Sequence, residues 1–158
     1  MQVEMSLMQK LGLKPVKNTI PVIIDAHDEH AGCTLAKTYG IELVLPLQPN
    51  LPIGSQIKVS ISSNDIALSL NHISGISMQN QIKGKICALI FNTNSVLVQI
   101  DCGSIWLASV TLKACKDMGL QEGGSIYCLA KTHAFSYCLN TNSYSLQQLL
   151  NGEKQDSD

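Results

Sequence analysis

Two successive series of short β-patterned runs constrain the fold of this chain more than any other feature. The first series lies at residues 20–24, 33–36, 41–45, 56–60 and 66–70, and the second at 83–90, 95–100, 104–109, 125–130 and 134–139. Turn-forming residues separate the runs, as in Asn92-Thr93-Asn94. Many short strands at even spacing are typical of an all-β barrel or sandwich.

The two series form an internal repeat. Gly40 and Gly103 each lie between two runs, at equivalent places in the two series. The segment 52–57 before a run of the first series is similar to the segment 121–126 in the second. Repetition of one small unit predicts two barrels in succession. The expected organisation is a connector at residues 1–17, a first repeat at 18–72, a second repeat at 73–142 and a polar tail at 143–158.

One short helix is expected inside a repeat, and only in the second. Thr111 is a suitable N-cap, residues 112–118 are compatible with a helix, and Gly119 suits the C-cap. The first repeat has the proline-bounded stretch 46–52 in the same place. The connector has apolar residues at helical spacing up to Gly12, which predicts a separate short helix there.

Composition excludes several classes of function. Charged residues make up 15% of the 158 residues, aromatic residues 4%, and all 11 basic residues are lysine, with a net charge of −1. Nucleic-acid-binding proteins normally have a basic patch and stacking aromatics, so we expect no nucleic-acid partner. No apolar run approaches the roughly 20 residues that span a membrane, and the N-terminus lacks the pattern of a signal peptide. We expect a chain that is not inserted in a membrane and that hides part of its surface against another subunit.

The sequence contains no pattern that predicts catalysis or a metal site. No G-x-x-x-x-G-K-[ST] sequence is present, so the chain has no P-loop for a nucleotide, and we expect no enzymatic activity. His27-Asp28-Glu29-His30 has no matching ligands elsewhere and is interpreted as a solvated turn. The six cysteines form no C-x-x-C pair, so we expect reduced thiols that behave as small buried hydrophobic residues.

The most informative stretch is residues 76–86, which read I-S-M-Q-N-Q-I-K-G-K-I. They resemble the Mop signature, in which I-S-x-R-N opens the repeat and a G-x-V strand follows. In the same register, residues 107–111 resemble the strand that enters the helix, 118–123 the turn after it, and 129–132 the strand end with its K-[ST] pair. The match thus keeps one register from Ile76 to Thr132. The chain therefore resembles the C-terminal di-Mop (TOBE) regulatory region of the ATP-binding subunit of molybdate ABC transporters, which implies two OB-like barrels.

The resemblance also implies a site for molybdate or tungstate in the second repeat, formed between subunits. The family pattern carries over onto Ser77, Gln79, Asn80, Thr111, the main chain of Ala114, Lys131 and Thr132. This set suits a tetrahedral dianion because hydroxyls and amides donate hydrogen bonds and Lys131 adds a positive charge. The family commonly has arginine where Gln79 stands, and glutamine brings donors without a charge. The first repeat has Ser62-Ser63 in place of the Lys131-Thr132 pair, which predicts weaker binding there or none.

As the resemblance implies it, the function is regulatory: bound oxyanion stabilises a closed pairing of regulatory domains and slows transport. The expected ligand is molybdate or tungstate, with no other cofactor and with molybdenum present only as molybdate. The expected partners are a second copy of the chain, an ATPase domain and membrane permease subunits, and the expected location is the cytoplasm, at the membrane through the transporter. Two alternatives stay open: a structural TOBE dimerisation module without oxyanion binding, and a molybdate storage or sensor Mop protein.

Overall fold

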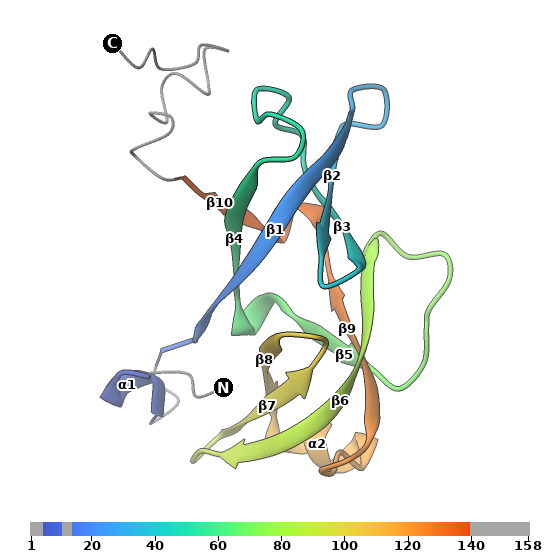
Figure 1. The fold of residues 1–158 in the computed structure, drawn as a ribbon. Coiled ribbons are helices and arrows are strands. Elements are labelled where there is room, and N and C mark those ends of the chain that lie inside the picture. Colours follow the sequence, from blue (N-terminus) through green and yellow to red (C-terminus); the bar gives the residue numbers. More distant parts are fainter. Residues whose placement is uncertain (1–4, 11–13, 140–158) are drawn as a thin grey trace. The chain divides into compact units, whose positions relative to one another are not determined.

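The computed structural model describes residues 5–10 and 14–139, which form mainly β-strands (Figure 1). Up to residue 72 the elements are α1 (Leu7–Lys10), β1 (Lys17–Asp28), β2 (Cys33–Thr38), β3 (Ile41–Pro46), β4 (Gln56–Ser62), the 3-10 turn η1 (Ser63–Asp65) and β5 (Ala67–Ser69). After it they are β6 (Asn80–Phe91), β7 (Ser95–Asp101), β8 (Ile105–Thr111), α2 (Leu112–Met118), β9 (Ser125–Ala130), η2 (Thr132–Ala134) and β10 (Ser136–Cys138). Each predicted run overlaps one strand, so the all-β prediction is confirmed. Neither α-helix in this described part is long and apolar enough to cross a membrane.

The strands form two five-stranded sheets that repeat one pattern. The order is β10-β4-β1-β2-β3 in one sheet and β5-β9-β6-β7-β8 in the other. Each sheet receives its short outer strand from the other half of the chain, because β5 pairs with β9 and β10 pairs with β4. The last strand of each predicted series therefore completes the sheet of the other series.

This strand exchange produces two compact units that are interleaved along the sequence. Unit 1 contains the described residues up to 18 together with residues 61–134, and unit 2 contains residues 19–60 together with the described residues from 135. The compact units therefore do not follow the sequence ranges 18–72 and 73–142 end to end. The predicted connector helix is present at α1, while its remaining predicted residues and the polar tail lie outside the described part of the chain.

The two units share the same backbone frame. In unit 2, the N–H of Ile24 donates to the carbonyl of Ser55 (3.0 Å), and the N–H of Gly54 donates to the carbonyl of Ile24 (2.7 Å). In unit 1, Ile86 makes the same two bonds with residues 123–124, at 2.9 and 2.7 Å. The strand pairing also shifts register immediately after each isoleucine. The internal repeat is confirmed, and β1 and β6 correspond residue by residue when Ile24 is aligned with Ile86.

Alternating burial directs one face of each long strand into a core. In β1, Ile20, Val22 and Ile24 are buried between exposed neighbours. In unit 1, Ile86 and Trp106 are almost completely buried, at 2% and 1% exposure. Full burial of an aliphatic side chain of this size contributes about 1.5–3 kcal/mol, so these positions stabilise each unit.

Gly84 stands in β6 where β1 has Val22. A Cβ atom on Gly84 would lie 2.6 Å from Cγ2 of Ile100 and 2.7 Å from Sγ of Cys102. These distances are too short for any side chain. The glycine of the signature is therefore needed because β7 passes close to the backbone of β6 at this point.

The two units close their sheets with different side chains. In unit 2, the hydroxyl of Tyr137 on β10 donates to the carbonyl of Pro46 on β3 (2.7 Å), which joins the two outer strands. In unit 1, the side chain of Asn18 donates to the carbonyl of Leu107 on the outer strand β8 (2.9 Å) and accepts from its N–H (2.8 Å). One side chain thus satisfies both free backbone groups of an edge residue.

The helix α2 has both predicted caps. The hydroxyl of Thr111 accepts a hydrogen bond from the N–H of Ala114 (2.9 Å). Gly119 adopts the left-handed conformation with φ of 62°, and the N–H of Leu120 returns to the carbonyl of Cys115 (3.1 Å). This is the arrangement in which glycine ends a helix at least cost.

His27 differs from the sequence-based prediction of a solvated turn at 27–30. β1 extends to Asp28, and the half-buried ring of His27 lies 2.9 Å from the hydroxyl of Thr34 through Nδ1 and 2.7 Å from the carbonyl of Leu51 through Nε2. Only Glu29 and His30 lie in the exposed turn. The prediction was wrong for His27 because the strand continues past the last apolar residue, which fixes the ring against β2.

Candidate functional site

The start of β6 and the end of β9 bring the two halves of the signature together. The antiparallel pairing places Asn80 opposite Ala130. The pairing ends there, because β6 begins at Asn80, β9 ends at Ala130 and Thr132 already belongs to η2. The segment with Ser77 and Gln79 and the Lys131-Thr132 pair therefore flank the sheet of unit 1 at the same end.

The side chains at this end differ in accessibility. Ser77, Gln79 and Lys131 are exposed and Thr132 is half-buried, so a dissolved anion can reach all four. Asn80 is 1% exposed and lies inside the unit. The four accessible side chains offer two hydroxyls, one amide and one ammonium group, which can donate to the oxygens of an anion. The only positive charge among them is that of Lys131.

The loop before β6 is held by a residue that the motif analysis did not single out. The side chain of Gln81 accepts from the N–H of Ile73 (2.9 Å) and donates to the carbonyls of Ile73 (2.7 Å) and Met78 (3.3 Å). The ring of His72 also contacts the ring of Tyr127 edge-on, with centroids 6.1 Å apart. Gln81 thus fixes the backbone on both sides of Ser77. Nothing in the sequence pattern distinguished this glutamine from an ordinary strand residue.

Thr111 and Ala114 lie apart from the other predicted ligands. Thr111 pairs with Ser95, and β7 meets β6 where Val96 pairs with Phe91. Asn80 and Phe91 are the two ends of β6, which at about 3.3 Å per residue corresponds to roughly 36 Å of strand. Figure 1 shows α2 at the end of unit 1 that is opposite the start of β6. One copy of the chain therefore does not bring all seven predicted residues to one point.

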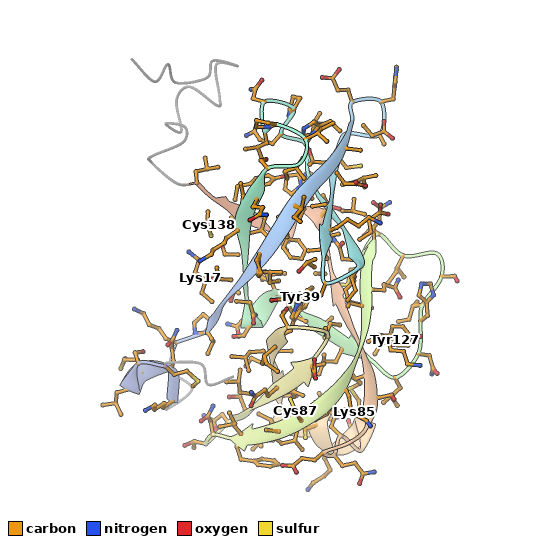
Figure 2. All side chains as sticks on the ribbon, in the orientation of Figure 1. Lys17, Tyr39, Lys85, Cys87, Tyr127 and Cys138 are labelled. Carbon is orange, nitrogen blue, oxygen red and sulfur yellow. The ribbon has the colours of Figure 1, made fainter. Side chains whose placement is uncertain are left out.

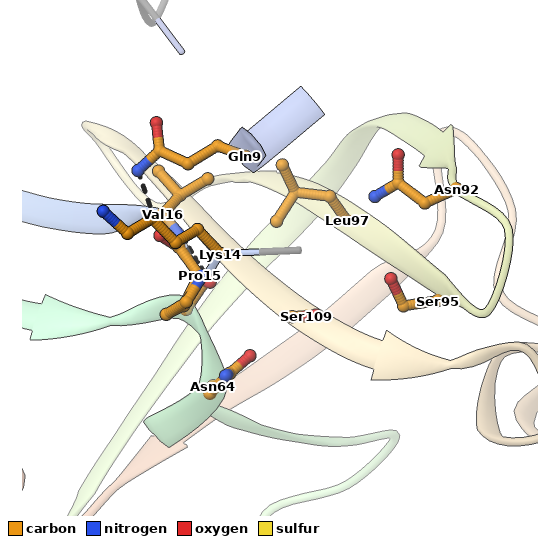
Figure 3. A pocket seen from close by; sticks show the side chains of 10 residues that line it. Gln9, Lys14, Pro15, Val16, Asn64, Asn92, Ser95, Leu97 and Ser109 are labelled. Atoms are coloured by element: carbon orange, nitrogen blue, oxygen red, sulfur yellow. Dashed lines mark hydrogen bonds between the residues drawn. The ribbon is translucent and has the colours of Figure 1, made fainter. Parts of the chain in front are cut away.

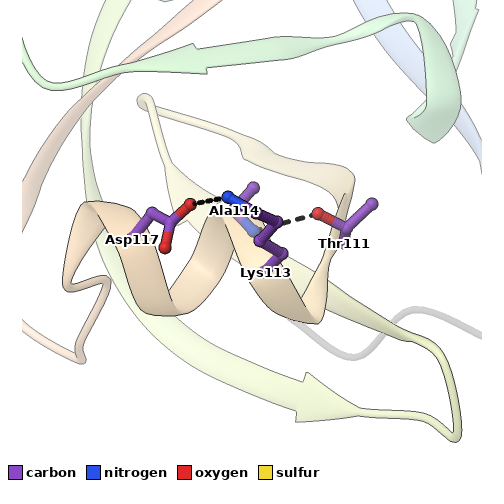
Figure 4. A network of polar contacts seen from close by, with 4 residues as sticks. All are labelled: Thr111, Lys113, Ala114 and Asp117. Carbon is purple, nitrogen blue, oxygen red and sulfur yellow. Dashed lines mark hydrogen bonds and ion pairs between the residues drawn. The ribbon is translucent and has the colours of Figure 1, made fainter.

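The polar groups at the start of α2 already bond to one another (Figure 4). The N–H of Ala114 is taken by Thr111, which leaves the hydroxyl hydrogen of Thr111 available to donate. Lys113 forms an ion pair with Asp117 at 2.5 Å, and both side chains are largely exposed. An exposed pair of this kind adds little stability, but it offsets the charge of Lys113 beside Thr111.

A counterpart of the signature lies in the first repeat and was missed in the sequence. Asn18 corresponds to Asn80 and Lys17 to Gln79, by the same alignment that relates Ile24 to Ile86. The signal was present as a polar pair at the start of the first strand, but residues up to 17 were assigned to a connector. The first repeat therefore has a cation where the second has a neutral amide.

Two cysteine thiols are held in the protonated form by their surroundings. Partial desolvation of its thiol, and then the nearby charge of Asp101, raise the pKa of Cys87. Hydrogen bonding to Cys102, 3.9 Å away between sulfur atoms, and then burial raise the pKa of Cys128. A raised thiol pKa opposes nucleophilic reactivity. All six cysteines are free thiols, and Cys87, labelled in Figure 2, is the exposed exception to the expected burial.

Comparison with known proteins places this geometry in context. No protein-family model matches the chain. The molybdenum import ATP-binding protein ModC of Albidiferax ferrireducens is 31% identical over 108 residues, which cover 67% of this chain and 29% of that protein. ModC of Mesorhizobium japonicum is 27% identical over 138 residues, covering 82% of this chain and 37% of the relative. The chain is a homologue of part of ModC.

The chain spans less than two fifths of the length of these ModC relatives. Its fold is similar to the solved structure of a cytoplasmic molybdate-binding protein, ModG, in a form with molybdate bound. The TM-score is 0.68 at 16% identity, and the match covers 78% of this chain and 96% of ModG. Together, the ModC homologues and the ModG fold fit the Mop/TOBE region that the sequence predicts.

Proposed function

We propose that this chain is the oxyanion-binding regulatory region of the ATP-binding subunit of a molybdate importer. The observation that carries the proposal is the pairing of Asn80 with Ala130, because the exposed Ser77 and Gln79 precede β6, and Lys131 and Thr132 follow β9, at that same end of the sheet. Homology to ModC supports the transporter, and the molybdate bound by ModG supports the ligand. The proposed role is the binding of an oxyanion.

A complete site needs a second copy of the chain. Thr111 and the start of α2 lie at the opposite end of unit 1 from Lys131, so a homodimer can place the Thr111 end of one copy against the Lys131 end of the other. Two such sites then form per symmetric pair, since a two-fold contact uses each surface twice. An anion that bridges two copies stabilises the paired state over the separate state, and this difference in affinity is the basis of regulation. The ATPase domain and permease subunits of the importer, acting at the cytoplasmic side of the membrane, are the other partners.

One observation favours a purely structural TOBE module instead. Gln79 brings no charge, and the N–H of Ala114 is already occupied by Thr111. A module of this kind would pair two subunits without an oxyanion. The similarity to ModG supports a third possibility, a molybdate storage or sensing protein.

Titration calorimetry with molybdate and with sulfate tests the proposal. We expect wild type to bind molybdate and Lys131→Ala to lose at least tenfold in affinity, because a hydrogen bond to a charged group is worth about 1.5–3 kcal/mol. Lys85→Ala is the matched control, since it removes an exposed lysine from the same strand pair without touching the Lys-Thr pair. Unchanged affinity in Lys131→Ala would contradict the site. If wild type binds no oxyanion yet is dimeric by light scattering, the structural module replaces this proposal.

A further inference from the structure

An open groove on unit 2 lies apart from the proposed oxyanion site, which belongs to unit 1. Its volume is about 280 Å³, and its mainly apolar lining comes from β1, from the end of β2 with the turn after it, and from the start of β4. The small cavity of unit 1 in Figure 3 has about 90 Å³ and a mainly polar lining. Pockets for drug-sized ligands occupy about 300–1,000 Å³, so the groove of unit 2 suits a smaller organic molecule.

The walls of this groove are apolar side chains that water reaches. On β1, Pro21 and Ile23 are exposed and alternate with the buried Val22, so both lie on the outward face of the sheet. Ile23 is 46% exposed, and Tyr39, which also lines the groove, is 61% exposed. A single exposed hydrophobic residue is ordinary, but here three of them border one groove. An apolar molecule that covers them removes their surface from water, which is favourable.

Tyr39, labelled in Figure 2, has a backbone conformation that tyrosine rarely adopts. Its φ is 48°, and it is the one residue other than glycine with a positive φ in the described part of the chain. Tyr39 and Gly40 form the two-residue turn between β2 and β3, because Thr38 pairs with Ile41. Such turns favour asparagine before glycine, since bulky side chains are strained at positive φ. Strained residues cluster at functional sites, and the ring of Tyr39 offers a face on which a planar group can stack.

The charge at the groove is positive. Lys37 is the one charged side chain among the described residues that line it, and no aspartate or glutamate is among them. Lys37 pairs across the strands with Ile23 on β1 and with Glu42 on β3. It forms no ion pair with Glu42, since the single ion pair within residues 5–10 and 14–139 is that of Lys113 with Asp117. The ammonium group of Lys37 thus remains available to a negatively charged group of a ligand.

We propose that this groove binds a small organic carboxylate with a planar apolar body. The body covers Pro21 and Ile23 and stacks on the ring of Tyr39, and the carboxylate accepts a hydrogen bond from the ammonium group of Lys37. An inorganic oxyanion fits less well, because the apolar walls offer no donors to its other oxygens. The lining lies entirely within unit 2. The inference therefore goes beyond the proposed function and depends neither on molybdate nor on a second copy of the chain.

The test is titration of the full chain with benzoate, followed by the amide chemical shifts of Thr38, Gly40 and Ile57. We expect saturable shifts with a Kd on the order of 1 mM, since a ligand of this size makes few contacts. Benzamide has the same shape without the charge and should bind about threefold more weakly, as one exposed charge contact implies. Acetate has the charge without the ring and should also bind more weakly. Equal affinity for benzoate and benzamide would overturn the inference, and an absence of saturable shifts would leave this face to a protein partner instead.

Two variants test the charge and the ring separately. Lys37→Gln removes the charge, so the affinity for benzoate should fall about threefold. Lys58→Gln is the matched control, since Lys58 is an exposed lysine of the same unit that does not line the groove. Tyr39→Asn gives the turn the residue that it favours, so the urea midpoint of unfolding should rise while the shifts with benzoate disappear. Wild-type affinity for benzoate in either groove variant would overturn the inference. Molybdate affinity should be the same in both variants as in wild type, so the two sites are tested independently.

Discussion

β1 and β6 are built on one backbone frame, and their exposed side chains differ in chemistry. Each strand has one isoleucine, Ile24 on β1 and Ile86 on β6, whose backbone is hydrogen-bonded to the turn before the fourth strand of the same repeat. On β1, Pro21 and Ile23 face solvent, and Ile23 is 46% exposed. Their counterparts on β6 are Lys83 and Lys85, which are also exposed. One unit therefore presents an apolar strand surface, and the other presents a basic one.

This difference shows which positions the fold leaves free. The frame is made by backbone hydrogen bonds and by buried aliphatic residues at equal spacing, so any exposed residue can be exchanged without disturbing it. The residues at the ends of β4 and β9 also differ in type between the repeats. They are Ser62-Ser63 in the first repeat and Lys131-Thr132 in the second. A binding function can thus be confined to one repeat while both keep the same architecture.

The largest effect is expected at Gly84, where β6 and β1 differ in how closely a neighbouring strand approaches the backbone. Gly84→Val gives β6 the residue of its β1 counterpart, but its Cβ would lie 2.6 Å from Ile100. We expect a loss of about 3 kcal/mol in the free energy of unfolding, the upper part of the usual range for overpacking. Urea unfolding followed by the fluorescence of Trp106, the single tryptophan, reports on unit 1. Lys85→Ile, which copies exposed Ile23, should change stability by less than about 0.5 kcal/mol, and equal losses would contradict the packing argument.

The closure of unit 1 by Asn18 gives the next largest effect. Asn18→Ala leaves both backbone groups of Leu107 without this partner, in a buried position. We expect a loss of about 2 kcal/mol, because an unsatisfied buried group costs about 1–3 kcal/mol. The same fluorescence-detected urea experiment measures it. Thr19→Ala changes the exposed neighbour and serves as control, and similar midpoints for the two variants would show that the bridge does not stabilise the unit.

Restoring a cation at the signature removes one difference between the repeats. Lys17 is the β1 counterpart of Gln79, so Gln79→Arg gives the second repeat a charge at that position as well. Molybdate affinity should rise about tenfold, as a charge-assisted bond of roughly 1.5 kcal/mol implies, and the gain should shrink with added salt. Calorimetry at two salt concentrations measures both effects. Gln121→Arg adds the same charge at an exposed turn, and a gain of similar size there would point to general attraction instead of a site.

The smallest effect concerns the tyrosine that closes unit 2. Tyr137→Phe removes the hydrogen bond to Pro46 and should cost about 1 kcal/mol near neutral pH. Burial raises the pKa of Tyr137 to about 12, above the value of about 10 for a free tyrosine. Between these values the unfolded chain has released a proton that the folded chain keeps, so wild-type stability falls as pH rises through this window.

The difference between wild type and Tyr137→Phe isolates this contribution, since the other titrating groups are common to both proteins. Urea unfolding followed by far-ultraviolet circular dichroism measures it. The stability advantage of wild type should shrink from about pH 10 to about pH 12. Tyr39→Phe, at an exposed tyrosine in the same unit, is the control for the loss of a hydroxyl that is not buried. A constant advantage across the window would contradict the role of the buried hydroxyl.

Local sequence patterns predicted the strands and α2 because these depend on neighbours in the chain. The caps Thr111 and Gly119 are examples, since each bonds within the adjacent turn of helix. The exchange of β5 and β10 was not predictable in this way, because such short strands have too few side chains to specify distant partners. The separation of Thr111 from Lys131 depends on the path of β6 and on strand order.

The exchanged strands also bear on how the chain folds during synthesis. β10 pairs with β4 through Ser136 and Ser60, so the whole intervening chain must close as one long loop before that sheet is complete. Non-local pairing of this kind slows folding, because loop closure costs entropy before the contacts form. Until β10 has left the ribosome, β4 is an uncovered edge with free backbone groups that can pair with another nascent chain. A pause of translation between β4 and β10 is therefore expected to prolong the exposure of that edge.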